Sequence, residues 1–220
     1  FVMEADGVRW AMDFGMQDYE SLESKGIKLF GRNQEAERWK VFRYSNLVHN
    51  TLTIDSQLQR VKGHAPIIKS GSSPANIFAV TDLGAVYDSS LAAAVRGIAI
   101  IDKSYVVVKD EIKTLDKPTT VRWTMLTPAT VKITSDKTAE LSSNGKRLLL
   151  EVNTTTAVSM KTWVTNPPPN SYDAPNPGTM LVGFEMTVPA NSSQTLEVVL
   201  APQKTQAKPI RKSAGVMSWK

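Results

Sequence analysis

Short runs of apolar and β-branched residues recur along the chain, and turn-forming residues separate them. Clear examples lie at residues 8–12, 76–81, 94–101 and 105–112. Runs of this length with little helical periodicity predict strands of antiparallel sheets that pack face to face. Polar and apolar residues alternate over residues 195–198, as in a strand with one face in water. The pattern therefore predicts an all-β fold, a large antiparallel β-sandwich with long loops and few short helices.

Turn signals join several of these runs into hairpins. Asp102-Lys103-Ser104 separates two apolar runs, and Asn144-Gly145, a strong hairpin signal, separates two more. Further strands are predicted at residues 41–44, 52–54, 119–126, 130–134, 139–141, 147–152, 157–164, 179–188 and 193–200. Short helices are predicted at residues 19–25, 33–38 and 89–94. Residues 165–178, rich in proline and asparagine, predict an irregular loop that is either functional or a plain surface connection.

The length of 220 residues and a hydrophobic share of 41% suffice for one large β domain with its own core. We expect this sandwich domain to span residues 1–202. Residues 203–220 are predicted to form a basic tail, because its basic residues meet no acidic one: Lys204, Lys208, Arg211, Lys212 and Lys220. The chain has no cysteine, which excludes disulfides and leaves the compartment open.

The formal net charge of +5 suits an acidic partner, although such a charge is also ordinary for a domain of this size. Basic and aromatic residues are not interleaved on one element, which argues against a nucleic-acid partner. No apolar run approaches the roughly 20 residues that a membrane span needs. The first residues, Phe1-Val2-Met3-Glu4-Ala5, resemble the middle of a strand, so we expect the chain to be a fragment of a larger protein.

Asp13 and His49 are the residues best placed to carry chemistry. Asp13 follows an apolar run and precedes Phe14-Gly15, where the chain must turn, and His49 opens a predicted strand beside Asn50. A carboxylate and an imidazole on adjacent strands are suitable ligands for a divalent metal such as zinc. Zinc usually takes at least three protein ligands, and a histidine at a strand edge is often hydrogen-bonded to backbone instead.

The spacing Arg43-x-x-x-x-x-His49-Asn50-Thr51, with Trp10-Ala11-Met12-Asp13-Phe14-Gly15 upstream, resembles the heparinase II/III family of polysaccharide lyases. The resemblance is strongest over residues 1–63. It implies an α/α toroid that precedes a β-sandwich, and a zinc ion bound in the sandwich. The implied ligands are a histidine of an upstream His-x-x-Asp motif, an aspartate that Asp13 matches, and a histidine that His49 matches. The first ligand would lie a few residues before Phe1.

The resemblance also implies β-elimination at a uronic acid, in which a base removes the C5 proton and the 4-O-glycosidic bond breaks. Most catalytic residues would come from the toroid, so the present chain alone is expected to be inactive. Some members use a tyrosine of the sandwich, between the aspartate and the final histidine. This interval contains Tyr19 and Tyr44. Tyr19 is the predicted catalytic residue, because it follows Gly15 in a loop and Tyr44 is expected to pack in a strand.

Three further residues are predicted to bind substrate. The guanidinium of Arg43 can hold a carboxylate with two parallel hydrogen bonds, although pairing with Asp13 or Glu37 is equally expected. Asn50 adjoins His49 and can stabilise the substrate carboxylate. Trp39 is the tryptophan closest to the motif and can serve as a platform for a sugar ring.

The expected partners are thus an acidic polysaccharide and an N-terminal toroid of the same protein, in the periplasm or at the surface of a bacterium. The rival class is a non-catalytic carbohydrate-binding or adhesion β-sandwich module. The upstream sequence separates the two: a toroid with a His-x-x-Asp motif favours the lyase, and a further sandwich favours the rival.

Overall fold

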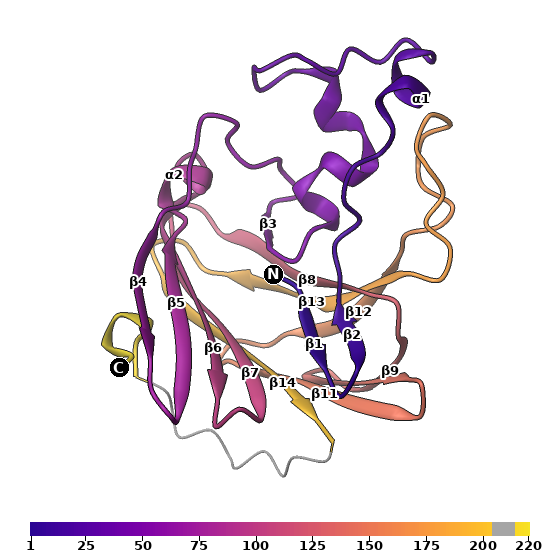
Figure 1. The fold of residues 1–220 in the computed structure, drawn as a ribbon. Coiled ribbons are helices and arrows are strands. Elements are labelled where there is room, and N and C mark those ends of the chain that lie inside the picture. Colours follow the sequence, from indigo (N-terminus) through magenta and orange to yellow (C-terminus); the bar gives the residue numbers. More distant parts are fainter. Residues whose placement is uncertain (204–213) are drawn as a thin grey trace.

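The structure, a computed structural model, describes residues 1–203 and 214–220. In these residues fourteen strands form three antiparallel sheets (Figure 1). The largest sheet has eight strands in the order β4 (Ile67–Ser72), β5 (Asn76–Asp82), β6 (Leu91–Ile101), β7 (Tyr105–Thr114), β14 (Ser193–Pro202), β11 (Lys146–Asn153), β10 (Thr138–Ser143) and β9 (Thr130–Ser135). The second has the order β12 (Ser159–Val164), β13 (Met180–Val188), β8 (Thr119–Thr127) and β3 (Leu52–Ile54). The third pairs β1 (Met3–Ala5) with β2 (Val8–Ala11).

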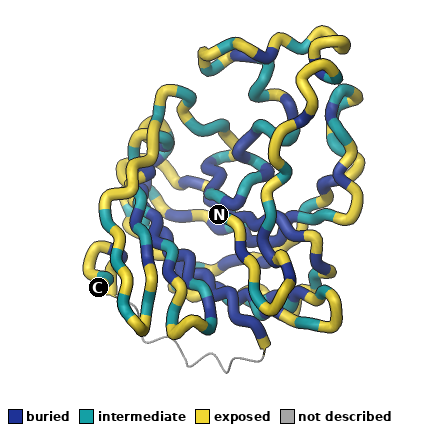
Figure 2. The backbone as a smooth tube through the Cα atoms, viewed as in Figure 1, coloured by how far each residue is buried: buried dark blue, intermediate teal, exposed yellow. Residues whose placement is uncertain are grey.

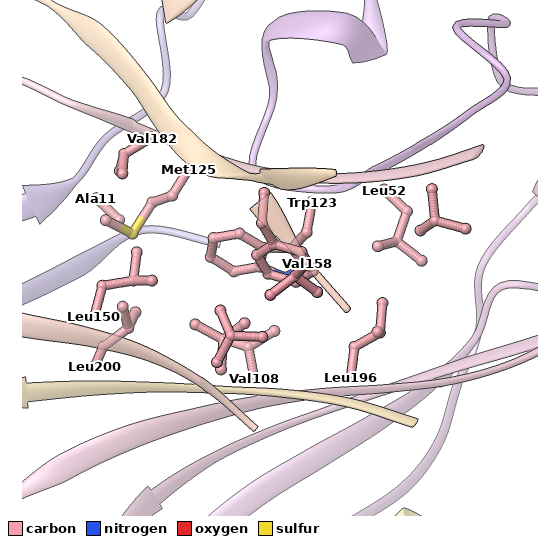
Figure 3. Packing of buried hydrophobic residues seen from close by; sticks show 14 of the residues in the cluster. Ala11, Leu52, Val108, Trp123, Met125, Leu150, Val158, Val182, Leu196 and Leu200 are labelled. Carbon is pink, nitrogen blue, oxygen red and sulfur yellow. The ribbon is translucent and has the colours of Figure 1, made fainter. Parts of the chain in front are cut away.

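The core lies between the eight-stranded and the four-stranded sheet, so the predicted β-sandwich is confirmed. Trp123 of β8 and Phe184 of β13 stack with ring centroids 5.9 Å apart and an interplanar angle of 6°. Figure 3 shows Trp123 and Met125 facing Leu196 and Leu200 of the opposite sheet. Burying such a side chain contributes about 1.5–3 kcal/mol. Figure 2 shows that buried positions gather along these strands.

The segment between β2 and β3 forms a cap over the four-stranded sheet (Figure 1). It contains α1 (Tyr19–Glu23) and three 3-10 helices, η1 (Glu37–Lys40), η2 (Phe42–Tyr44) and η3 (Asn46–Val48). The irregular segment 165–178 lies beside this cap, as predicted, without strand or helix. Gln17 Nε2 donates to the Tyr172 carbonyl at 2.7 Å, and Asp173 Oδ1 accepts from Phe42 N–H at 2.9 Å. Polar contacts therefore fasten the loop to the cap.

Both predicted hairpins are confirmed. Asp102 and Lys103 join β6 to β7, and Asn144 and Gly145 join β10 to β11, each with a positive φ. Such φ values match the twist of the paired strands. The strand β4, however, was not predicted.

Three predictions of secondary structure are wrong. Residues 33–38, predicted as a helix, form turns, and only the 3-10 helix η1 (Glu37–Lys40) begins among them. Residues 41–44, predicted as a strand, enter 3-10 turns, because Tyr44 N–H bonds locally to the Val41 carbonyl at 2.9 Å. Residues 89–94, predicted as a helix, begin β6, and the helix α2 (Gly84–Tyr87) precedes them. The alanines there favour helix, but pairing with β7 overrides that preference.

The end of the chain packs on the face of the eight-stranded sheet that points away from the main core. Val216, at the start of η4 (Val216–Ser218), is fully buried against Phe78 and Val80. Trp219 meets Phe78 edge to face and leaves no room for a Cβ on Gly97. The tail predicted at residues 203–220 falls partly outside the described residues, at 204–213. No helix among the described residues has the length and apolar character to cross a membrane.

Candidate functional site

Asp13 lies at the turn that ends the β1–β2 hairpin. Met12 N–H donates to the Leu126 carbonyl of β8 at 2.9 Å, so the chain is tied to the four-stranded sheet just before Asp13. Asp13 Oδ1 accepts a 2.8 Å hydrogen bond from Gly15 N–H. Gly15 has a φ of +66°, a conformation that glycine adopts without strain. The predicted turn is therefore present, and it orients the carboxylate.

His49 follows η3 and faces Asp13. Its Nδ1 lies 2.6 Å from Asp13 Oδ2, and its Nε2 lies 3.1 Å from the carbonyl oxygen of Arg43. Both ring nitrogens face oxygen acceptors, so both contacts are hydrogen bonds only when the ring is an imidazolium. The His49 carbonyl accepts from Thr124 Oγ1 at 3.0 Å, which fixes the segment on β8. The sequence placed the two residues on adjacent strands; in the structure Asp13 follows β2 and His49 precedes β3, and their side chains nevertheless meet.

The electrostatics of the pair favour an ionised Asp13. Partial burial by itself would raise the pKa of Asp13, but the hydrogen bond from Gly15 N–H and the interaction with His49 outweigh it. The pKa of Asp13 therefore lies below its ordinary value. A carboxylate that stays charged is ready to pair with a cation, whether imidazolium or metal.

Asn50 joins the two segments that carry the pair. It is buried, and its Nδ2 donates to the carbonyl oxygens of Phe1 and Met12 at 2.6 and 2.9 Å. Its Oδ1 accepts from Leu126 N–H at 2.6 Å. The side-chain amide is thus used within the protein, beside Asp13 on one side and His49 on the other. Its predicted role in substrate binding stays a prediction.

A buried ion pair supports the same segment from below. Arg96 of β6 donates from Nε and Nη2 to the two carboxylate oxygens of Asp110 of β7, at 2.7 and 2.9 Å. Its Nη1 donates to the Asn50 carbonyl at 2.9 Å. Arg96 is 7% exposed and Asp110 is fully buried. Neither residue was predicted to have a role, although a charged residue within each apolar run was a signal.

A polar hollow of about 390 Å³ opens beside the Asp13–His49 pair, and we call it the His49 hollow. Its walls include Asp13, His49, Asn50 and Arg96, together with Tyr44. These residues come from β6, from the turn after β2, from η2 and from the segment after η3, so the sheets and the cap meet at the hollow. The arrangement can hold a small polar group against an acid, a base and a cation.

Of the two candidate tyrosines, Tyr44 lines the His49 hollow. Its hydroxyl donates to the Gln17 carbonyl at 2.8 Å. Tyr19 is the N-terminal residue of α1, is 42% exposed and packs edge to face on Phe30. It is not among the described residues that line the hollow. The catalytic role predicted for Tyr19 stays a prediction without geometric support in this chain.

The other two predicted substrate residues lie on the cap. The Arg43 guanidinium donates to Asn176 Oδ1 at 2.9 Å and to the Pro175 carbonyl at 3.1 Å. It therefore holds the loop 165–178, and it pairs with neither of the acids considered from the sequence. Trp39, on η1, is half-buried and donates from Nε1 to the Asn33 carbonyl at 3.0 Å. Substrate binding by Arg43 and Trp39 stays a prediction.

The residues fit a zinc ion only in part. Asp13 and His49 offer an oxygen and a nitrogen ligand on facing side chains, which is suitable donor chemistry. No group of three or more histidine, cysteine, aspartate or glutamate residues with metal-binding geometry occurs in the described part of the chain. Both nitrogens of His49 also contact protein oxygens, so metal binding must replace one of these contacts. The described residues thus offer two of the three or more protein ligands that zinc usually takes, and zinc binding stays a prediction.

Comparisons with known proteins agree with this architecture. A family model described as heparinase II/III-like, C-terminal, matches residues 1–211. A solved structure of heparinase III is 19% identical, with a TM-score of 0.68 and coverage of 96% of this chain. A heparan sulfate lyase from Pedobacter heparinus is 15% identical, with a TM-score of 0.64 and coverage of 89%. At these identities the likeness shows a shared fold. The comparison with curated proteins gave no match.

The fold and the Asp13–His49 pair define a β-sandwich domain with a polar hollow beneath a loop cap. The family match covers nearly the whole chain, and the chain belongs to the heparinase II/III-like C-terminal domains. It spans 31% of the length of the heparinase III structure and 29% of the heparan sulfate lyase.

Proposed function

We propose that this chain is the C-terminal sandwich domain of a lyase that cleaves a uronate-containing acidic polysaccharide, such as a glycosaminoglycan, by β-elimination. Membership of the heparinase II/III-like family supports this proposal. The observation that carries it is the 2.6 Å contact between His49 Nδ1 and Asp13 Oδ2 at the wall of a polar hollow. The complete activity belongs to a longer protein, with an N-terminal α/α toroid as the partner domain.

The proposed reaction breaks the bond between C4 and the glycosidic oxygen. A base takes the C5 proton, and the electron pair of the C5–H bond forms the C4–C5 double bond. The departing oxygen gains a proton. Abstraction of the C5 proton requires the uronate carboxylate to be neutralised by nearby donors or cations. We assign most of the catalytic residues to the toroid and keep Tyr19 as the catalytic residue predicted in this chain, so the chain alone is inactive. Within the chain, the His49 hollow would hold the sugar unit beside Asp13 and His49.

Zinc is part of the proposal for the longer protein. Asp13 and His49 would be two of its ligands, and the third would come from residues that precede Phe1 in that protein. Phe1 lines the His49 hollow, so residues joined to it would begin beside the pair. A bound zinc would supply a fixed positive charge there. We propose a bacterial protein located in the periplasm or at the cell surface.

The test uses a longer protein that contains this chain and its upstream domain, incubated with uronate-containing polysaccharides. The expected result is new ultraviolet absorbance from an unsaturated uronate. His49→Ala is expected to lower turnover by about 10- to 100-fold, as loss of a metal ligand or its support does. The matched control is His64→Ala, because His64 is exposed and lies in a loop. A folded longer protein that cleaves none of these polysaccharides would contradict the proposal and favour a non-catalytic carbohydrate-binding module.

A further inference from the structure

A second hollow of about 220 Å³ lies next to the His49 hollow, and we call it the Trp39 hollow. Tyr44, Asn46 and Gln59 line both, so the two hollows share a wall. Trp39 and Arg60 line only the second hollow and not the first. Its volume is below the roughly 300–1,000 Å³ of a pocket for a drug-sized ligand, so it suits a single sugar unit.

The side chains of the Trp39 hollow combine an aromatic surface with positive charge. The Arg38 guanidinium lies over the Trp39 ring, 4.7 Å from the ring centroid. Arg38 itself does not line the hollow, and its buried Nε has no hydrogen-bond partner among the described residues. Arg60 adds a second cation, with its nearest acid Asp88 at 3.4 Å on the surface. No acidic residue is among the described residues that line the hollow.

The loop that forms one side of the Trp39 hollow is held in place by hydrogen bonds. Gln59 N–H donates to Asn46 Oδ1 at 3.0 Å, and Gln59 Nε2 donates to Tyr87 Oη at 2.7 Å. Gln34 Oε1 accepts from Val61 N–H at 2.9 Å. A wall fixed in this way loses little conformational freedom when a ligand binds. The hollow is therefore preorganised.

We infer that the Trp39 hollow is a subsite for the sugar unit adjacent to the one at the His49 hollow, and that it takes a unit bearing a carboxylate or a sulfate ester. The C–H face of the sugar ring packs on the Trp39 indole. The anionic group lies toward the guanidinium of Arg60, the arginine that lines the hollow among the described residues. This inference rests on the proposed function, and it adds that the bound polymer spans both hollows.

Oligosaccharides of different length distinguish binding at the two hollows. Wild-type chain and variants are titrated by NMR with a heparin-derived tetrasaccharide and with the corresponding disaccharide. Trp39→Leu is expected to weaken tetrasaccharide binding by about five- to tenfold, because the ring platform is lost. Arg60→Gln is expected to weaken it by about two- to fivefold. The disaccharide, which fits the His49 hollow alone, should be affected by less than about twofold in both variants.

The matched control is Trp163→Leu. Trp163 is also half-buried and also carries an arginine, Arg122, over its ring at 4.8 Å, but it lines neither hollow. Trp39→Phe keeps an aromatic face and is expected to retain most of the affinity. An equal loss in Trp163→Leu, an unchanged tetrasaccharide affinity in Trp39→Leu, or no binding of either oligosaccharide would overturn the inference.

A desulfated tetrasaccharide identifies the anion. Binding that weakens without sulfate assigns the Arg60 side to a sulfate ester, and unchanged binding assigns it to the carboxylate. Failure of the subsite and failure of the proposed function give different results. If the longer protein cleaves polysaccharide while Trp39→Leu binds normally, only the subsite is wrong. If Trp39-dependent binding persists but the longer protein does not cleave, only the lyase function is wrong.

Discussion

At the residue scale, Asn50 joins the two backbone segments that carry the Asp13–His49 pair. Asn50 follows His49 directly, and its Nδ2 donates to the carbonyl of Met12, the residue before Asp13. One side chain thus sets the distance between the two backbone segments. The third bond, to Leu126 N–H, fixes both segments on β8. Asn50, which the sequence predicts to bind substrate, therefore also has a structural role within the protein.

Asn50→Ala is expected to destabilise the chain by about 2–4 kcal/mol, since it leaves the Leu126 N–H and two carbonyl groups without their partner. Chemical denaturation measures the change. Asn153→Ala, at an exposed strand end, is the control and should change stability by less than about 0.5 kcal/mol. A similar stability for both variants would show that water replaces the Asn50 bonds at no cost.

The ion pair beneath Asn50 gives a second prediction. Asp110→Asn removes the charge that compensates Arg96 in a buried setting and is expected to cost about 3–5 kcal/mol. Glu4→Gln breaks an exposed pair with Arg9 and should cost less than about 1 kcal/mol. The two free energies of unfolding are measured in the same denaturant series. Equal costs would mean that the Arg96 guanidinium reaches water in the variant.

At the element scale, the strands were predictable where burial alternates or where a turn has a fixed chemistry. Asn144-Gly145 determines its hairpin locally. Residues 41–44 have strand-like composition, but Val41 buries itself against Leu22 and Leu29 while the backbone turns, a tertiary effect that composition does not contain. The edge strand β4 carries mostly exposed and partly exposed residues, so its alternation was weak.

The candidate site was predictable only in part, for a related reason. Asp13 and His49 were found because each has a recognisable neighbourhood in the sequence. The contact of Arg96 with the Asn50 carbonyl joins residues 46 positions apart, one on β6 and the other in the segment before β3. Gln59 likewise reaches the hollows only through the folded loop. Contacts of this kind follow from the packing of the two sheets, and a single sequence holds no local signal for them.

Glu185 of β13 ties three neighbouring strands together. It accepts from Lys161 Nζ of β12 at 2.5 Å and from Arg122 Nε of β8 at 3.0 Å. The hydrogen bond from Lys161 lowers the pKa of Glu185, burial opposes this, and Arg122 lowers it further. A carboxyl group whose pKa is lowered in the folded state stabilises the fold at pH values above its ordinary pKa of 4.5. This contribution is lost as the pH falls through the pKa of the folded state.

Glu185→Gln is therefore expected to cost about 0.5–1 kcal/mol at neutral pH. The difference from wild type should shrink progressively below pH 4.5, because the wild-type carboxyl group then takes up a proton. Unfolding free energies measured across this range check the prediction. Glu151→Gln, on β11 and without an ion pair among the described residues, is the matched control. A difference that grows in acid would contradict the assigned direction of the shift.

At the scale of the whole molecule, the sandwich supports the two hollows from below, and the cap supplies further side chains that line them. The eight-stranded sheet supplies Arg96 from below, the four-stranded sheet holds Asn50, and the cap brings Tyr44 and Trp39 to the two hollows. Both hollows lie on the side that carries the cap. A second domain that approached this side would find a preformed surface with a polar pair and two arginines.

This arrangement predicts how metal binding depends on the extent of the protein. The chain alone offers two zinc ligands and is expected to bind zinc weakly, whereas a longer protein with the upstream histidine should contain stoichiometric zinc. Metal analysis and titration are carried out on both proteins and on Asp13→Ala, His49→Ala and the control His64→Ala of the longer one. Zinc should be lost in the first two and retained in the control. If zinc stays bound without Asp13 and without His49, the pair is a salt bridge that orders the turn, and the metal, if the enzyme uses one, lies elsewhere.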